Sequence, residues 1–527
     1  MQVASVIGRE FAFRLLQAIS GMREDLKYQL LKLQGLELIY EKSLFPELEY
    51  IFKHALVQEV AYNSLLSTRR KEIHQRIGSA IEELYTGNLE EFYEVLAYHY
   101  GRSDDQEKTL EYIILANRKA AKLNALQDAM SYFEAAMALS HTAADNAHHR
   151  LLRVSLLVDN VFVFLLLNQL PFYYNLLLKH EPMAATLENS ALLGGFYARK
   201  ALCEMQFGRT DNALASAKKA IDLCEACGNA LDAGIAYMVS QWALFYKSEF
   251  EAVLALKEKV IQSHQKVFFL QSYVYSFCAS SVAYGLLGWW DEAVRDGEIA
   301  LKATDEHSDA SLSSFAHHVT SMICCQKGDI ARAIELAEMA VRKASSPADT
   351  LFARGTLAWV YCRAGQPEKD LDYLAGAVRE FRKMGSDVNV VVWGTNLGEG
   401  YLLNYQYDEA KKELKATLQL AEIKGVKFSA ASCHYLLGKI SLITDPAQKK
   451  TPSAKTRFEK AISICREIKA ENRLAVAYAG LGRYYKLQGD AAAAREYLNQ
   501  ALEIFERLGT LLEPEKVREE LAELTEV

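Results

Sequence analysis

The sequence predicts an all-α protein that consists mainly of stacked helical pairs, with a small mixed block at its N-terminus. Small residues recur with a period of about 40 residues over most of the chain. Glycines recur where the second helix of each pair should end. Residues 1–85 lack this period and contain an alternating segment typical of a β-hairpin. We therefore expect about 10 helical pairs that wind into a superhelix, preceded by a small domain.

The strongest copies of the repeat share a glycine and two alanines at fixed spacing. Their alanine pairs are Ala213/Ala220, Ala293/Ala300, Ala333/Ala340 and Ala494/Ala501. From position 213 onward, the first of the two positions advances by 39, 41, 40, 37, 40, 44 and 40 residues. The preceding helix carries a small residue twelve positions earlier, after allowance for extra residues in the longest copy. These small residues are Ala201, Ser240, Ser281, Ser321, Ala358, Gly398, Gly438 and Gly482.

This pattern has a mechanical cause. Two antiparallel helices can cross closely only where their side chains are small, so we expect each small residue to mark a crossing. Burying each larger side chain between neighbouring pairs contributes roughly 1.5–3 kcal/mol. One pair alone has too little core to be stable, and the pairs must therefore stack.

The N-terminal block is predicted to contain three amphipathic helical segments and a hairpin. The segment "LELIYEKSLFPELEYIFKH" alternates like two strands, with a turn at Phe45-Pro46. The helix that starts at His54 should pack its apolar residues, Leu56 and Val60 among them, on the core of this domain. We expect a winged-helix-like domain over 1–85, linking helices and a first repeat over 86–141, and the repeat solenoid over 142–527.

Composition narrows the class of protein. The net charge is −7, so no global attraction to nucleic acid or to anionic membranes is expected. Nine cysteines, an odd number, and no signal peptide predict a reduced, cytoplasmic protein. Residues 161–178 carry no charge, but the polar Asn168, Gln169 and Asn175 and the repeat register favour a buried repeat over a membrane span.

The pattern of small residues, aromatics, glycines and alanines resembles the tetratricopeptide repeat in a long form of roughly forty residues. The resemblance covers about residues 92–525 and is strongest from 195 onward. The usual proline after the second helix is mostly missing. Other residues replace the usual first-helix tryptophan: Tyr197, Phe277, His317 and Tyr478.

The N-terminal part of the sequence shows a second resemblance to known proteins. "ASVIGREFAFRLLQAISG" and "YIFKHALVQEVAYNSLLSTRRKEIHQRIGSAIE" are similar to the region after the nucleotide-binding module in bacterial signalling ATPases linked to class III adenylate or guanylate cyclases or to serine/threonine kinases. The resemblance implies a winged helix that relays between an NTPase switch and a repeat sensor. The sequence contains no phosphate-binding loop and no cyclase or kinase signature, so we expect a C-terminal piece of such a protein or a truncated homologue.

Several suggestive residue groups have simpler interpretations. Cys224 and Cys227 form a C-x-x-C without a second pair at zinc spacing, and His317 occupies the packing position of the missing tryptophan. Of the adjacent Trp289 and Trp290, we expect one ring to pack and the other to be exposed. The basic stretch "TRRKEIHQR" is interpreted as a solvated helix face. No catalytic set is recognisable, and we expect no enzymatic activity, no cofactor and no metal.

Function is therefore expected to reside in the concave wall that the first helices form. Superposition of the repeats gives ten candidate binding residues: Tyr237, Gln241, Phe245, His318, Met322, Trp359, Arg363, Glu399, Arg483 and Lys486. The first hypothesis is a regulatory module that binds a protein partner or its own ATPase and cyclase domains. The alternative is a sensor with a small-molecule effector in the groove, and DNA binding through the winged helix is a distant third.

Overall fold

The computed structural model describes residues 1–22, 25–43, 47–142, 146–444 and 454–524. The chain divides into two compact units, Met1–Val163 (unit 1) and Phe164–Val527 (unit 2), which are described separately. This division by contacts does not test the predicted functional boundaries near 85 and 141, which stay a prediction.

The first part of unit 1 contains a three-stranded antiparallel sheet, whose strands alternate along the chain with helices. The strand order is β1-β3-β2, with Phe11 opposite Tyr50 and Ile39 opposite Phe52. This start is compatible with a winged-helix-like domain, although the pattern did not predict β1, and the predicted turn at Phe45-Pro46 lies outside the described residues. The elements are α1 (Gln2–Ile7), β1 (Glu10–Ala12), α2 (Phe13–Ser20), α3 (Leu26–Gly35), β2 (Ile39–Ser43), β3 (Glu49–Phe52), α4 (Ala55–Asn63), α5 (Ser67–Leu84), η1 (Leu89–Phe92), α6 (Tyr93–Tyr100), α7 (Gln106–Lys122), α8 (Leu126–Thr142) and α9 (Ala147–Asp159).

The helix expected to run on from His54 differs from the prediction in two respects. It is interrupted after α4, because Leu66 has an extended backbone and α5 starts anew at Ser67. The expectation that Leu56 and Val60 pack on the core is wrong, since these side chains are 70% and 63% exposed. The α4 face that turns inward carries Ala61 instead, and His54 precedes the helix without a side-chain capping bond.

Two buried histidines join α5 to α6. His74 Nδ1 lies 2.9 Å from His99 Nδ1, and His74 Nε2 lies 3.1 Å from the Tyr62 hydroxyl. Burial, with the nearby Arg102 and Arg70, lowers the pKa of His74 to about 4. Burial, with His74 and Arg102, lowers the pKa of His99 to about 3. Both rings are therefore neutral in the folded protein at pH 7.

Because of this histidine pair, we expect the folded state of unit 1 to lose stability at acidic pH. Unfolded histidine has a pKa near 6.5, so below that pH the unfolded chain binds more protons than the folded chain. The stability contributed by the neutral pair should therefore fall as pH drops from about 6.5 towards 4. Thermal unfolding of His99→Asn should show a shallower loss over this window than the parent chain. Changing the exposed His54 to Gln should leave the pH profile unchanged, and an equal flattening in both variants would contradict the assignment.

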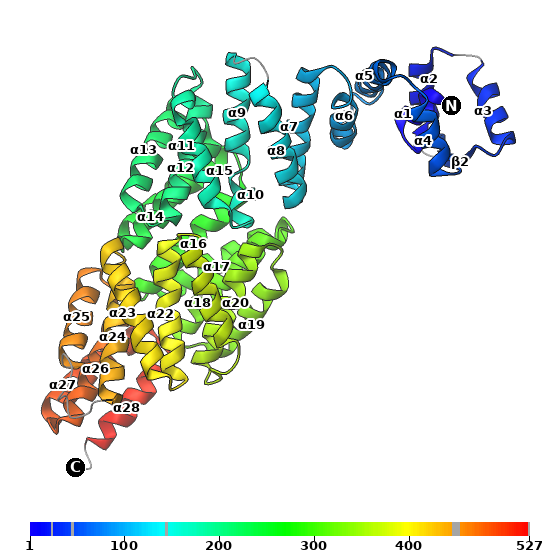
Figure 1. Cartoon of the computed structure of the whole chain (residues 1–527). Helices are drawn as coiled ribbons and strands as arrows, with labels where there is room; N and C mark the ends of the chain where they lie inside the picture. Colours follow the sequence, from blue (N-terminus) through cyan, green and yellow to red (C-terminus); the bar gives the residue numbers. More distant parts are fainter. Residues whose placement is uncertain (23–24, 44–46, 143–145, 445–453, 525–527) are drawn as a thin grey trace. The chain divides into compact units, whose positions relative to one another are not determined.

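Unit 2 is a tetratricopeptide-type superhelix of stacked helical pairs, which confirms the predicted fold class. Even-numbered helices α12–α26 are the first helices of the pairs, and each packs on the odd-numbered helix that follows it (Figure 1). Its elements are α10 (Val161–Leu166, which begins before the unit boundary), α11 (Leu170–Ala184), α12 (Ser190–Gln206), α13 (Thr210–Cys227), α14 (Ala230–Tyr246), α15 (Phe250–Lys266), α16 (Leu270–Leu287), α17 (Trp290–Glu306), α18 (Ala310–Lys327), α19 (Ile330–Lys343), α20 (Pro347–Arg363), α21 (Leu371–Lys383), α22 (Asp387–Leu403), α23 (Tyr407–Lys424), α24 (Lys427–Thr444), α25 (Ala454–Glu467), α26 (Glu471–Leu487), α27 (Ala491–Leu508) and α28 (Glu513–Glu523).

The predicted crossings are confirmed at atomic detail. A Cβ atom added at Gly398 would lie 2.4 Å from Leu414 Cγ, and one added at Gly482 would lie 2.7 Å from Leu498 Cγ. Where the small residue is serine, it also satisfies the facing backbone: the Ser281 hydroxyl donates to the Ala293 carbonyl at 2.7 Å. At Ser281 and Gly482 the small residue meets the carbonyl of the alanine twelve positions later, and at Gly398 it meets Leu414 of the same following helix, as expected for a close crossing.

Candidate functional site

The superhelix of unit 2 winds tightly enough for successive turns to touch. The Trp290 indole N–H donates to the Thr510 hydroxyl at 3.2 Å, 220 residues further along the chain. The Phe428 backbone N–H donates to the Ser248 hydroxyl at 3.2 Å, and the ring centroids of Phe245 and Phe428 lie 5.0 Å apart. Contacts between turns therefore fill much of the concave side that an open superhelix would leave free.

A cavity of about 270 Å³ is left between the first helices. Residues from α14, α16, α18, α20, α22, α24 and α26 line it, together with residues from α25 and α28. Five of the ten predicted wall residues lie here: Phe245, Met322, Trp359, Arg363 and Glu399. The structure thus brings together side chains that the sequence separates by more than 150 residues (Glu399 less Phe245 is 154 positions).

Trp359, Arg363 and Glu399 form a connected group in this wall. The Trp359 indole N–H donates to Glu399 Oε2 at 2.8 Å, and Arg363 Nη1 lies 3.5 Å from Glu399 Oε1. The Arg363 guanidinium also lies 5.6 Å from the centre of the Trp359 ring. Burial, the largest single influence, lowers the pKa of Arg363, but Glu399, Cys325, Glu513 and Tyr435 together raise it, so its pKa lies above the usual range. Arg363 and Glu399 are therefore already engaged with each other.

A second cation in the cavity, Arg473 at the start of α26, was not among the predicted residues. Its Nη1 donates to the Phe428 carbonyl at 3.1 Å and to the Ser432 hydroxyl. Within the part of the chain that the structure describes, no carboxylate forms an ion pair with Arg473. Burial lowers its pKa, and nearby Arg363 acts in the same direction.

Asn396 on α22 also lines the cavity and was also missed. Its side chain is only 9% exposed, and among the described residues its Nδ2 has no hydrogen-bond partner. A signal was present in the sequence, because Asn396 interrupts the apolar stretch "VVVWGTNLG" one helical turn before Glu399. Its significance depends on the cavity, which the sequence does not show.

The other five predicted residues lie outside the lining of this cavity. The Tyr237 hydroxyl donates to Glu225 at 2.6 Å, Arg483 Nε donates to Glu520 at 2.8 Å, and Lys486 pairs with Glu523. His318 is buried among aromatic rings, with Nδ1 3.2 Å from the Thr356 hydroxyl. These four side chains take part in packing or in ion pairs, and their predicted binding roles stay untested.

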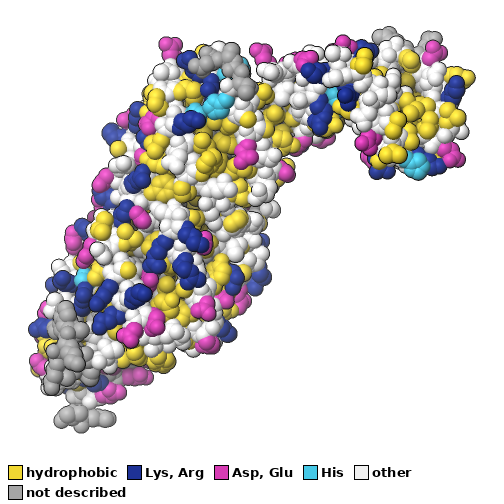
Figure 2. Space-filling model, viewed as in Figure 1, with side chains coloured by type: hydrophobic (Ala, Val, Ile, Leu, Met, Phe, Trp, Pro, Cys, Tyr) yellow, Lys and Arg dark blue, Asp and Glu magenta, His cyan; other side chains and the backbone are white. Residues whose placement is uncertain are grey.

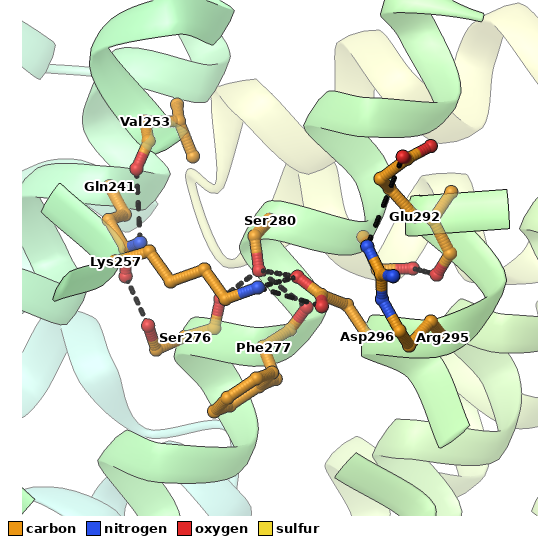
Figure 3. Close-up of polar contacts among 11 residues, drawn as sticks. Gln241, Val253, Lys257, Ser276, Phe277, Ser280, Glu292, Arg295 and Asp296 are labelled. Carbon is orange, nitrogen blue, oxygen red and sulfur yellow. Dashed lines mark hydrogen bonds and ion pairs between the residues drawn. The ribbon is translucent and has the colours of Figure 1, made fainter. Parts of the chain in front are cut away.

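Gln241, the fifth, belongs to a buried polar network shown in Figure 3. It donates to the Val253 carbonyl at 3.1 Å and accepts from the Ser276 hydroxyl at 2.6 Å. Beside it, Lys257 reaches across the helices to Asp296, which also accepts from Ser280 (Figure 3). The network joins two successive helical pairs, α14/α15 and α16/α17, and has a structural role.

The remaining sequence motifs are placed as follows. Cys224 is buried and Cys227 is exposed, both as free thiols. Trp290 is buried while Trp289 is 49% exposed, as predicted. His317 Nδ1 lies 2.7 Å from the Ser313 carbonyl. Among the described residues, no group of three His, Cys, Asp or Glu side chains is placed to hold a metal ion.

Two features bear on membrane or nucleic-acid contact: the uncharged stretch and the distribution of surface charge. Residues 161–178 fall in α10 and α11, and no helix in the described ranges is both long and apolar enough to span a bilayer. On the face of unit 2 shown in Figure 2, Lys and Arg side chains are interspersed with Asp and Glu.

Comparison with known proteins supports the repeat assignment over part of the chain. The tetratricopeptide-repeat family profile matches residues 447–507. A pentatricopeptide repeat-containing protein of Arabidopsis thaliana is 43% identical over 58 residues, which is 11% of this chain and 11% of that protein. The chain thus spans a small fraction of the length of this curated relative.

Comparison with solved structures gives matches of low sequence identity. A chain of the APC/C hetero-tetramer Cut9-Hcn1 has a TM-score of 0.49 and 15% identity, covering 85% of this chain and 88% of that one. A Signal Transduction ATPase with Numerous Domains protein from Pyrococcus horikoshii, with a tetratricopeptide repeat sensor, has a TM-score of 0.44 and 13% identity. That alignment covers 94% of this chain and 65% of the other, so this chain matches only part of that protein.

Proposed function

We propose that this protein is a regulatory sensor whose unit 2 binds a small effector inside the superhelix. One observation carries the proposal: the concave side is closed by contacts between turns and retains a cavity of about 270 Å³ with polar groups among apolar walls. Such a cavity suits a small molecule, because pockets for small ligands are concave, mostly apolar and lined by a few placed polar groups. A long peptide would need an open groove.

The N-terminal resemblance suggests what the sensor controls. We infer that residues 1–85 form a winged-helix-like relay of a cytoplasmic signalling ATPase of the kind linked to cyclases or kinases. Effector binding would then bias the NTPase switch by binding one conformation more tightly than the other. The sequence of the parent gene is the direct check, because an ATPase segment with a cyclase or kinase should precede Met1 in it.

A protein partner is the second candidate, and one feature of unit 1 favours it. Leu56 and Val60 expose an apolar strip on α4, next to Met1 and Val57. Exposed apolar surface of this kind is typical of sites that contact another protein. The apolar strip on α4 would then be the docking site for the protein's own catalytic domains or for a separate protein partner.

The sensor proposal predicts ligand stabilisation that depends on the cavity. A metabolite that binds in the cavity should raise the unfolding temperature of the full chain by mass action, by several degrees at saturating concentration. Val392→Trp, which places an indole in the cavity lining, should abolish this shift. Differential scanning fluorimetry against a metabolite panel measures both effects.

Ile423→Trp is the matched control, since Ile423 is 70% exposed on α23 and does not line the cavity. It should retain the full ligand-induced shift. A ligand that stabilises Val392→Trp as much as the parent chain binds elsewhere and would overturn the proposed location.

A further inference from the structure

We propose that the effector is a small organic anion whose carboxylate or phosphate group binds Arg473, with the Asn396 amide as a second donor. This inference rests on the proposed sensor function and specifies its ligand class. It is carried by three observations on the described residues: the charge balance of the cavity, an edge of the Arg473 guanidinium that meets no acceptor among them, and an Asn396 nitrogen that has no hydrogen-bond partner among them.

The charges that line the cavity do not balance. The described lining contains four cationic side chains, Arg363, Lys439, Arg473 and Lys516, and two carboxylates, Glu399 and Glu513. Both carboxylates are taken: Glu399 by Arg363 at 3.5 Å, and Glu513 by Lys516 at 3.1 Å. Two cations, Arg473 and Lys439, are left without a carboxylate partner among the described residues. The described cavity lining therefore has more cationic side chains than carboxylates.

Arg473 is positioned as a receptor for an anion. Within the described ranges Arg473 donates to the Phe428 carbonyl and to the Ser432 hydroxyl, and both hydrogen bonds use Nη1. The Nε and Nη2 edge has no acceptor among the described residues. This edge presents two parallel N–H groups, the arrangement that binds a carboxylate or phosphate in bidentate fashion. The guanidinium is also fixed against the Phe428 ring, 5.6 Å from its centre, so its orientation is preset.

Asn396 supplies the independent observation. Buried side-chain donors are nearly always hydrogen-bonded, because leaving one without a partner is unfavourable. Asn396 Nδ2 has no partner among the described residues although the side chain lines the cavity. An anionic oxygen in the cavity would satisfy this donor and neutralise Arg473 together. The aromatic side chains of Trp359, Phe428 and Tyr435 line the same space and suit the carbon body of an organic anion.

The test uses the full chain with two anionic probes and one neutral probe. Inorganic phosphate, glutarate and glutaramide are titrated at constant ionic strength, with sodium chloride as the balancing salt. The midpoint of thermal unfolding and isothermal titration calorimetry report binding. Phosphate or glutarate should stabilise the parent chain, whereas glutaramide, the uncharged analogue of glutarate, should not. Stabilisation by phosphate alone identifies a phosphate group as the ligand's anion, and stabilisation by glutarate alone identifies a carboxylate.

Arg473→Gln should weaken anion binding by at least about tenfold, since it removes a charge-assisted bidentate contact. Arg295→Gln is the matched control: it removes one positive charge from a side chain that is 65% exposed on α17, and it should bind as the parent does. If Arg473→Gln does not fold, two other variants test anion binding. Asn396→Asp adds a negative charge to the cavity lining, and Lys439→Gln removes a positive charge from it. Both should weaken anion binding.

Three results would overturn the inference: no stabilisation by either anion, an undiminished shift in Arg473→Gln, or equal stabilisation by glutaramide and glutarate. The last result would leave the sensor proposal intact, since a neutral ligand whose effect is lost in Val392→Trp still occupies the cavity. The sensor proposal itself would fail on a different result: no ligand would then show a stabilising effect that is lost in Val392→Trp.

Discussion

Replacing Asp296 by alanine should lower the free energy of unfolding by about 3–5 kcal/mol, the range for breaking a buried ion pair. Asp296 is 1% exposed and accepts hydrogen bonds from Lys257 Nζ at 2.6 and 2.7 Å and from the Ser280 hydroxyl at 2.6 Å. Removing the carboxylate leaves the Lys257 ammonium partly buried without its counter-charge. Urea unfolding followed by circular dichroism measures the change.

The control removes both charges. In the double variant Lys257→Met, Asp296→Leu, no charge is stranded, and replacing both partners of a buried pair by apolar residues is often nearly neutral. Ser280 keeps other acceptors, the Ser276 and Phe277 carbonyls. The double variant should therefore recover most of the stability. A loss below about 1 kcal/mol in Asp296→Ala would show that the ion pair contributes little.

Gly482→Ala should destabilise unit 2 by about 1–3 kcal/mol, because it overpacks a helix crossing. The new Cβ would lie 2.7 Å from Leu498 Cγ and 3.3 Å from the Ala494 carbonyl oxygen. Leu498 is fully buried, and the contacts involve its Cγ and the backbone of α27, so we expect α26 and α27 to move apart. Gly482→Leu should cost more. Thermal and urea unfolding of the full chain report both.

Gly376 provides the matched control within another helix of the same array. In α21, a Cβ at this position would meet only Arg379 Nη2, at 3.6 Å, which is an ordinary contact. Alanine is favoured over glycine inside a helix by roughly 0.5–1 kcal/mol, so Gly376→Ala should stabilise the chain. Opposite signs for the two Gly→Ala changes are the expected result; the same sign in both would contradict the crossing geometry.

The repeat architecture could be predicted because each helical pair encodes its own crossing. Gly482 and Ser281 lie close to the carbonyl of the alanine twelve residues later, and Gly398 lies close to Leu414, sixteen residues later. These short distances are set by the turn within one pair. This spacing within one pair does not depend on the neighbouring pairs, so it can be recognised from the sequence alone. Likewise, the five predicted wall residues that meet in the cavity share one face of successive first helices.

Features that depend on non-local pairing were not predictable in the same way. Strand β1 contains three residues and exists because Phe11 pairs with Tyr50, far along the chain. The exposure of Leu56 and Val60 depends on which face of α4 the rest of the domain covers, and amphipathic periodicity alone indicated the wrong face. Arg473 and Asn396 became notable only when both were found in one cavity.

By itself, the sequence determined the helical pairs, their period and their crossings, because these follow from residue size at fixed short spacing. Only the tertiary structure decided that the superhelix of unit 2 closes on itself. Closure results from the small rotation between neighbouring pairs, accumulated over several repeats until Trp290 reaches Thr510 and Phe245 reaches Phe428. The sequence of a single repeat does not show this accumulated rotation. The rotation nevertheless converts an open groove into a cavity. In that cavity the Arg473 guanidinium has no carboxylate partner among the described residues.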